Sequence, residues 1–241
     1  MILERIDPII EGEAPKLTKL EHLVRYKKSL EFLDKDSVVL DAGCGFGYGS
    51  DMLAQHSSKV IAIDNSPDAI NYAIKNYSRN NIRYYIGDLE NVDLSPFGKF
   101  NLITFFEVIE HLHKPEAALK NLREHISPKG CLLLSTPNSE CTIGYNPYHI
   151  KEYTKRELEE LLSKNGFEVN QILGQGYCTK ELTKFIKKVI GRKPEVNKDS
   201  TSAFSLAEQI PGGCEIQSKL YKCKLLTKKA RYFYFIVQPS D

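Results

Sequence analysis

The sequence predicts an α/β fold: a doubly wound, seven-stranded, mostly parallel sheet with helices on both faces. Short apolar segments rich in β-branched residues alternate with amphipathic helical segments along most of the chain, as in sheets built from crossover units. The composition agrees, because 241 residues with 41% hydrophobic and 27% charged side chains suit one large core. No apolar run approaches the roughly 20 residues that span a bilayer, and no signal peptide is readable at the N-terminus. We therefore expect a cytoplasmic protein without a transmembrane segment.

The first half of the chain shows the alternation most clearly. Leucines recur at helical spacing over 16–34, which predicts an amphipathic helix before the core. The β-branched run 37–41 stops abruptly in glycines, as a buried parallel strand does. The same pattern then repeats, and the expected elements are helix 48–56, strand 59–63, helix 67–77, strand 82–86, strand 101–106 and helix 116–125.

The second half of the chain adds three strands and one helix. Strand 131–136 follows a Pro-Lys-Gly turn. A helix capped by Thr154 ends at Gly166, because glycine readily adopts the left-handed conformation at a helix C-terminus. Strands 167–173 and 232–238 then complete the seven.

Three parts of the chain follow from these elements. Residues 1–34 form an N-terminal helical cap, 35–173 together with 232–241 form the core, and 174–231 form an insertion before the last strand. The insertion holds 13 Lys and Arg residues and 5 acids, a net charge of +8, so the rest of the chain carries −6 within a total of +2. Such an excess marks a solvated face or attracts anionic partners, which makes the insertion a candidate substrate or partner element. The six cysteines show no paired or metal-finger spacing, and we expect free thiols.

A glycine-rich turn, 41–49, ends the first strand and opens a helix, where the backbone can approach a ligand closely. The Gly-x-Gly-x-x-Gly spacing of dinucleotide-binding proteins fails in both registers, because the third glycine would fall on Tyr48 or Ser50. A phosphate-binding P-loop fails as well, since no Gly-Lys-Ser/Thr follows. Asp41, just before the glycines, suits a cationic or amine-bearing ligand better than a pyrophosphate, which an anion would repel.

Carboxylates also end the next two strands. Asp64 lies 19 residues after Gly45, where it can accept both hydroxyls of a ribose. Asp88 ends the third strand, where it could receive an exocyclic amine. Together with Asp41, these side chains describe a site for an adenosine that carries a positive attachment.

Four segments, VLDAGCGFGYGS, VIAIDNS, IGDLENV and FNLITFFEVIEHL, resemble the successive motifs of class I S-adenosylmethionine-dependent methyltransferases. The resemblance extends over residues 35–175 and implies a Rossmann-like fold with S-adenosylmethionine as the cofactor. It implies that the glycines line the methionine moiety, that Asp64 binds the ribose and that Phe106 lies under the cofactor. The implied cofactor-binding residues are Asp41, Gly43, Gly45, Gly47, Asp64, Asn65, Asp88, Leu89 and Phe106. Arg25 or Tyr26 could close the site from the N-terminal helix.

The segment after the fourth strand is the candidate for catalysis. Methyl transfer from a sulfonium is an in-line displacement, so holding both reactants in line supplies much of the acceleration. A hydroxyl acceptor must also lose a proton, and we expect a base or a metal ion near the ends of the fourth and fifth strands. At helical spacing, Glu107, Glu110 and His111 share one face. His149 is expected at the rim of the same crevice.

Two roles are open for these side chains. In the first they bind a divalent cation such as Mg or Mn, which grips the acceptor oxygen and lowers its pKa; the ligands are Glu107, Glu110, His111 and His149. This pattern is similar to the metal site of small-RNA 3′-end methyltransferases and to quinone-precursor O-methyltransferases with a Glu-x-x-Glu-His motif. In the second, His111 or His149 is a general base, and the Glu residues orient it.

A further resemblance concerns the acceptor. The segments ERIDP, EHLVRYKKSLEFL, STPN and HIKEYTKRELEELLSKNGFEV resemble methyltransferases of bacterial surface-polysaccharide biosynthesis. This favours O-methylation of a hydroxyl on a sugar, a glycan or another small molecule, with a phosphate-linked carrier suited to the basic insertion. One alternative is a metal-dependent RNA 3′-end 2′-O-methyltransferase, which is less supported because no series of stacking aromatic residues is present. Another is a non-catalytic cofactor-binding subunit.

Overall fold

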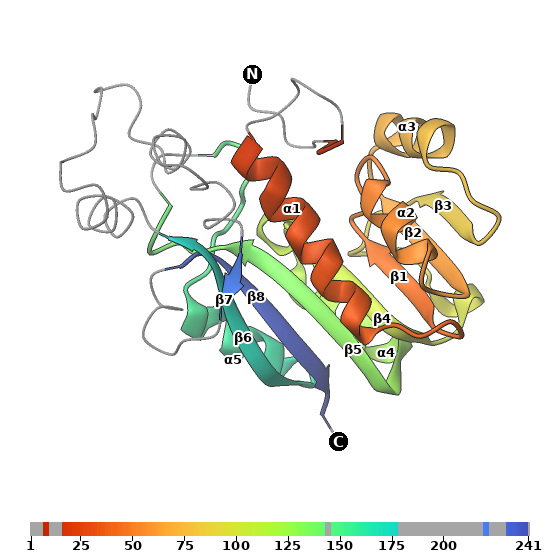
Figure 1. Ribbon diagram of the computed structural model, residues 1–241. Coiled ribbons are helices and arrows are strands. Elements are labelled where there is room, and N and C mark those ends of the chain that lie inside the picture. Colours follow the sequence, from red (N-terminus) through yellow and green to blue (C-terminus); the bar gives the residue numbers. More distant parts are fainter. Residues whose placement is uncertain (1–6, 10–15, 143–145, 178–218, 222–229, 241) are drawn as a thin grey trace.

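The computed structural model describes residues 7–9, 16–142, 146–177, 219–221 and 230–240, and these contain one mixed sheet (Figure 1). Its strand order is β3-β2-β1-β4-β5-β8-β6-β7. Seven of the strands coincide with the expected ones, so the predicted fold class is confirmed. The eighth, β7 (Leu220–Tyr221), is a two-residue strand within the segment expected as the insertion.

The parallel part of the sheet winds in two directions from its centre. It consists of β1 (Val38–Ala42), β2 (Lys59–Asp64), β3 (Ile82–Ile86), β4 (Phe100–Phe106) and β5 (Ile126–Pro137), and all neighbouring pairs among them are parallel. The chain proceeds from β1 to β2 and β3 on one side, and returns to β4 and β5 on the other. The carboxyl ends of β1, β2 and β4 therefore meet at a switch point, where ligands bind in such sheets.

The C-terminal part of the sheet is antiparallel. β8 (Ala230–Pro239) lies between β5 and β6 (Phe167–Tyr177) and is antiparallel to both. β7 pairs antiparallel with β6 at the edge. This arrangement places the start of β8 and the end of β6 beside the carboxyl end of β5, close to the switch point.

Helices cover both faces of the sheet. One buried cluster joins Val39 to side chains of α1 (Lys16–Ser29), α2 (Tyr48–Ala54) and α3 (Pro67–Asn76). A second joins Leu40 to side chains of α4 (Pro115–His125) and α5 (Lys155–Lys164). Because neighbouring residues of a strand point to opposite faces, β1 is buried on both sides. Figure 1 shows α1 lying across one of these faces.

Local signals explain the helix ends. The Ser66 hydroxyl accepts from the Ala69 N–H at the start of α3, and Thr154 and Glu157 form a capping box at the start of α5. α1 ends at Ser29 and is followed by a short 3₁₀ turn, η1 (Leu30–Phe32), which replaces the last turn of the longer helix expected over 16–34.

Two local expectations are wrong. Glu107 does not begin a helix: its φ is 54°, and only Ile109–His111 form a 3₁₀ turn, η3. β5 starts at Ile126, before the Pro-Lys-Gly turn and not after it. The reason is a register irregularity opposite Phe100 and Leu102, which lets the turn sit within the strand.

The cysteine prediction also needs a correction. Cys44 and Cys131 are buried and carry thiols that are not in a disulfide, as expected. Cys141 is disulfide-bonded, so the expectation of free thiols is wrong there. Spacing along the chain does not show which cysteines the tertiary fold brings together. The remaining three cysteines lie outside the described residues.

Most of the basic insertion lies outside the described residues, which omit 178–218 and 222–229. Where the chain is described, β6 extends to Tyr177 and β8 begins at Ala230, so both ends of the segment 174–231 belong to the sheet. No helix within the described ranges is long and apolar enough to cross a membrane.

Candidate active site

A pocket lies at the switch point of the sheet, between α1, the glycine turn and the segments that follow β2, β3 and β4. Seven of the nine predicted cofactor residues line it: Gly43, Gly45, Asp64, Asn65, Asp88, Leu89 and Phe106. Its acidic lining residues are Asp64, Asp88 and Glu107, and no Lys or Arg lines it among the residues that the structure describes. This charge pattern suits a cationic ligand and disfavours a pyrophosphate.

The glycines of the turn serve three different purposes. Gly43, with φ 83°, packs so closely that a Cβ would lie 2.2 Å from Val108 Cγ2. Gly45, with φ 52°, has no atom within 4 Å of the same position and opens onto the pocket. Gly47 does not line the pocket; a Cβ there would lie 2.6 Å from Ala73 Cβ, so it allows α3 to approach. Of these three glycines, Gly43 and Gly45 line the pocket and Gly47 does not.

Asp64 holds the turn in place. Its side chain is 5% exposed, and it accepts the Gly45 N–H on Oδ2 and the Ser66 N–H on Oδ1, both at 2.9 Å. Asp88 is exposed and accepts the Glu90 N–H at 2.9 Å. The two carboxylates thus lie at the ends of β2 and β3 as predicted, one buried at the turn and one at the surface.

Asp41 is placed differently from the prediction. It is 1% exposed and does not line the pocket. Oδ1 accepts hydroxyl protons from Tyr26 at 3.0 Å and Thr104 at 2.7 Å, and Oδ2 accepts one from Ser50 at 2.6 Å. The carboxylate is below the turn because β1 directs it inward, where three hydroxyls surround it.

Helix α1 forms one wall of the pocket. Tyr26 packs edge-on against Tyr48 and Phe106, with ring centroids 5.3 and 5.2 Å apart. His22 lies beside them, and its Nδ1 is 2.9 Å from the Tyr48 hydroxyl. Burial lowers the pKa of His22 to about 3, and the Arg25 guanidinium lowers it as well. His22 is therefore neutral at physiological pH.

We expect His22 to make the protein less stable in acid. Its pKa is about 3 in the folded protein and about 6.5 in an unfolded chain, so the unfolded state binds the extra proton, and stability falls as the pH drops through this window. His22→Gln should flatten the decline of Tm between these pH values, whereas His56→Gln at an exposed site should not. Identical acid slopes for the wild type and His22→Gln would contradict this assignment.

Arg25 makes a charged contact with the candidate catalytic segment. It is 1% exposed, and its Nη1 lies 3.1 Å from Glu107 Oε1. The same oxygen accepts the Ser135 hydroxyl at 2.7 Å. Arg25 Nε donates to Gln175 Oε1 at 2.7 Å, and its Nη2 has no hydrogen-bond partner within the described part of the chain. Glu107 is therefore held by α1 and β5.

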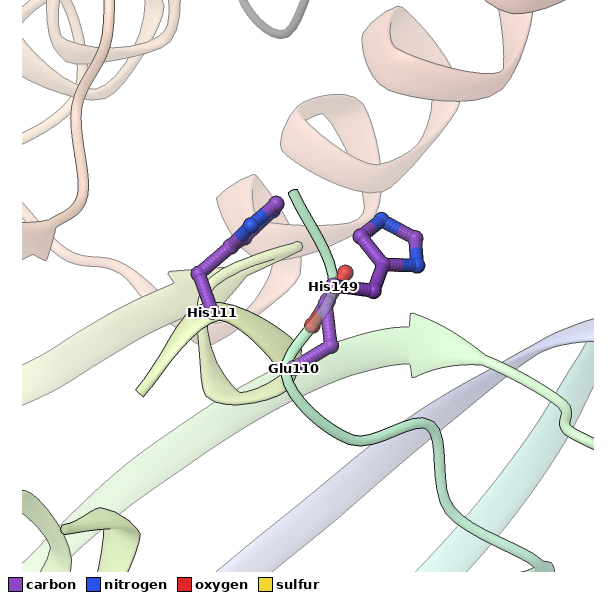
Figure 2. Close-up of side chains that lie close together, drawn as sticks. All are labelled: Glu110, His111 and His149. Carbon is purple, nitrogen blue, oxygen red and sulfur yellow. The ribbon is translucent and has the colours of Figure 1, made fainter. Parts of the chain in front are cut away.

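Three of the four predicted metal ligands come together. Glu110, His111 and His149 each offer one ligand atom, and these atoms lie within 4.8 Å of one another (Figure 2). Glu107 is not part of this cluster, because its left-handed backbone and its contact with Arg25 direct it elsewhere. The structure thus brings Glu110, His111 and His149 together and places Glu107 apart from them.

Hydrogen bonds orient both imidazoles of the cluster. His111 Nδ1 donates to the Tyr148 carbonyl oxygen at 2.9 Å, and His149 Nδ1 bonds to the Glu152 carboxylate at 2.6 Å. In this tautomer the Nε2 atoms carry the lone pairs, and that of His149 accepts from Asn146 Nδ2 at 2.8 Å. Such bonds at Nδ1 are typical of histidines that bind a metal or accept a proton through Nε2.

Glu110 is the buried member of the cluster. It is fully buried, its Oε2 accepts the Thr136 hydroxyl at 3.0 Å, and its Oε1 has no hydrogen-bond partner among the residues that the structure describes. Burial raises its pKa well above the usual range, and the nearby Glu107 carboxylate raises it further. A buried carboxylate oxygen without a partner is costly unless a cation or a proton compensates it.

Several functional residues escaped the sequence interpretation. His22, Phe46 and Tyr48 line the pocket, and Ser135 and Thr136 bind the two glutamates. Phe46 and Tyr48 stand between the glycines, a position that signals ligand contact. Ser135 and Thr136 precede Pro-Asn at the end of a predicted strand, and this position also indicates a place in the site. For His22 the sequence offers no comparable signal.

Comparisons with known proteins agree with this geometry. Residues 18–172 match a family described as a methyltransferase domain. A probable S-adenosylmethionine-dependent methyltransferase of Mycolicibacterium smegmatis is 36% identical over 142 residues, 56% of this chain and 54% of that protein. The chain thus spans about half the length of this relative.

Two further proteins extend the similarity. The ubiquinone biosynthesis O-methyltransferase of Rickettsia bellii is 27% identical over 194 residues, 73% of this chain and 76% of that protein. The crystal structure of magnesium protoporphyrin IX methyltransferase from Synechocystis PCC 6803, with bound SAH, has a TM-score of 0.56 at 19% identity, and the match covers 68% of this chain and 83% of that one. Because the family match covers more than half of the sequence, the chain belongs to the methyltransferase-domain family, whose cofactor is S-adenosylmethionine.

Proposed function

We propose that this protein transfers a methyl group from S-adenosylmethionine to a hydroxyl oxygen of a sugar, a glycan or another small molecule. The observation that carries the proposal is the position of His111. It lines the pocket at the switch point, and it also belongs to the cluster with Glu110 and His149. A group able to handle the proton of a hydroxyl therefore lies at the edge of the space for the methyl donor.

The pocket residues fit the proposed cofactor. Gly45 leaves space in the pocket that a side chain at this position would fill. The lining is acidic and contains no Lys or Arg among the described residues, which suits a positively charged sulfonium. The buried Asp64 would accept the ribose hydroxyls, and Leu89 and Phe106 offer apolar contact to the rings. S-adenosylmethionine, when bound, supplies an electrophilic methyl group.

We propose further that Glu110, His111 and His149 hold a divalent cation. The Nδ1 bonds of both imidazoles support this, as does Glu110 Oε1, which has no hydrogen-bond partner among the described residues. A cation at His149 Nε2 would replace the bond from Asn146 Nδ2. A carboxylate with two imidazoles suits Mn or Zn, and Mg less well because it prefers oxygen ligands. Such a cation would lower the pKa of an acceptor hydroxyl near the pocket.

Removing the metal tests this second proposal. Treatment with EDTA should lower the methyl-transfer rate at least about tenfold, and added Mn²⁺ or Zn²⁺ should restore it more fully than Mg²⁺. Elemental analysis of protein purified without chelator should show about one cation per chain. Unchanged activity after complete removal of metal would refute the cation and leave His111 or His149 as the general base.

The acceptor class needs a separate experiment. Isotopically labelled S-adenosylmethionine is offered with pools of small phenols, sugars and phosphate-linked glycan carriers, and short RNA. We expect label in the phenol or sugar pools, and the likeness to a ubiquinone biosynthesis O-methyltransferase supports the phenols. Label confined to RNA would replace the proposal with RNA 3′-end methylation, and no transfer by a protein that binds the cofactor would support a non-catalytic subunit.

A further inference from the structure

We infer that Tyr26 is a positioning residue for the cofactor, and that Asp41 acts through it: the Asp41 carboxylate fixes the Tyr26 hydroxyl, and this bond holds α1 in place as a wall of the pocket. The inference deepens the proposed function and rests on the pocket binding S-adenosylmethionine. It assigns Asp41 a role as an anchor for α1 and not as a cofactor ligand.

The Asp41 carboxylate does not reach the pocket. It is 1% exposed, lies outside the pocket lining, and receives hydroxyl donors on both oxygens, from Tyr26 and Thr104 on Oδ1 and from Ser50 on Oδ2. Contact with a ligand would require its side chain to leave the core. Of the three hydroxyls, only that of Tyr26 belongs to a residue that lines the pocket.

Tyr26 joins α1 to the floor of the pocket at several points. Its ring rests on the first turn of α2, where a Cβ on Gly49 would lie 2.0 Å from Tyr26 Cζ. The same ring packs edge-on against Tyr48 and Phe106, and both of these line the pocket. The position of Tyr26 therefore sets the position of two further pocket side chains.

The hydrogen bond from the Tyr26 hydroxyl to Asp41 fixes the orientation of the ring within this packing. Apolar burial is non-directional, whereas a hydrogen bond to a buried carboxylate constrains both the depth and the rotation of the Tyr26 ring. Burial raises the pKa of Tyr26 well above its usual value, and the adjacent Asp41 raises it further, so the hydroxyl stays a donor across the accessible pH range. Gly49 is needed for the same reason, since any side chain would prevent the ring from reaching Asp41.

The test uses Tyr26→Phe, which keeps the ring and removes only the hydroxyl. We expect the Kd for S-adenosylmethionine, measured by calorimetry on the full chain, to rise about tenfold, the order expected for one charge-assisted hydrogen bond. Amide hydrogens of α1 should exchange faster in the free variant, while those of α4 should be unchanged. Tyr234→Phe is the matched control, because Tyr234 packs on Phe106 from β8 and its hydroxyl does not contact Asp41; its Kd should stay within about twofold of the wild type.

A double-mutant cycle separates an anchor from a direct ligand. If Asp41 acts through Tyr26, Tyr26→Phe adds little to the loss of affinity in Asp41→Asn. Additive losses, or an unaltered Kd in Tyr26→Phe, would overturn the inference. Failure of the folded wild type to bind S-adenosylmethionine would instead refute the proposed function, and the exchange rates of α1 would still report whether Tyr26 anchors the helix.

Discussion

Replacing His111 by alanine is expected to lower kcat for methyl transfer by at least about 100-fold, the lower end of what a positioned acid–base group or metal ligand contributes. The reason is that this side chain alone joins the cofactor pocket to the cluster with Glu110 and His149 among the described residues. The Kd for the cofactor should change little, because the imidazole lies at the edge of the pocket. Single-turnover rates and calorimetry measure the two effects separately.

His113→Ala is the matched control for this prediction. His113 lies two residues further along, is exposed, and is not part of the cluster. Its substitution should leave kcat within about twofold of the wild type, as expected for a surface site. Retention of full activity in His111→Ala would remove the cluster from the mechanism under either a metal or a general-base role.

Replacing Asp64 by alanine is expected to raise the Kd for S-adenosylmethionine about 100-fold or more. Each hydrogen bond to a buried charged group contributes about 1.5–3 kcal/mol, and Asp64 would provide two to the ribose. The variant also loses the anchor of the Gly45 N–H, so the glycine turn is no longer held against the pocket. Calorimetric titration of the folded variant measures this loss.

Asp93→Ala controls for the loss of a local backbone bond. Asp93 accepts the Ser95 N–H at 2.9 Å, much as Asp64 accepts that of Ser66, but it is exposed and lies outside the pocket. This variant should show a small change in Tm and an unchanged Kd. If Asp64→Ala also left the Kd unchanged, the cofactor would have to bind elsewhere. Circular dichroism checks that Asp64→Ala is folded, and if it is not, Asp64→Asn replaces it in the titration.

The sequence by itself determined the layers, the strands and the acidic edge of the sheet. Alternation of strand and helix is a local periodicity, and it predicts where each strand ends. Since parallel strands end at the same edge, Asp64 and Asp88 are expected on the same side of the sheet as the glycine turn. The seven expected strands and the pocket lined by seven predicted cofactor residues follow from this rule.

Only the tertiary structure decided which way the other charged side chains face. Asp41 turns inward because Tyr26, Ser50 and Thr104, from three different elements, surround it with donors. Glu107 leaves the predicted cluster because its backbone is left-handed and α1 brings a buried guanidinium to it. The direction of a side chain depends on its backbone torsion and on partners contributed by distant parts of the chain. The spacing of residues along one segment predicts neither of these.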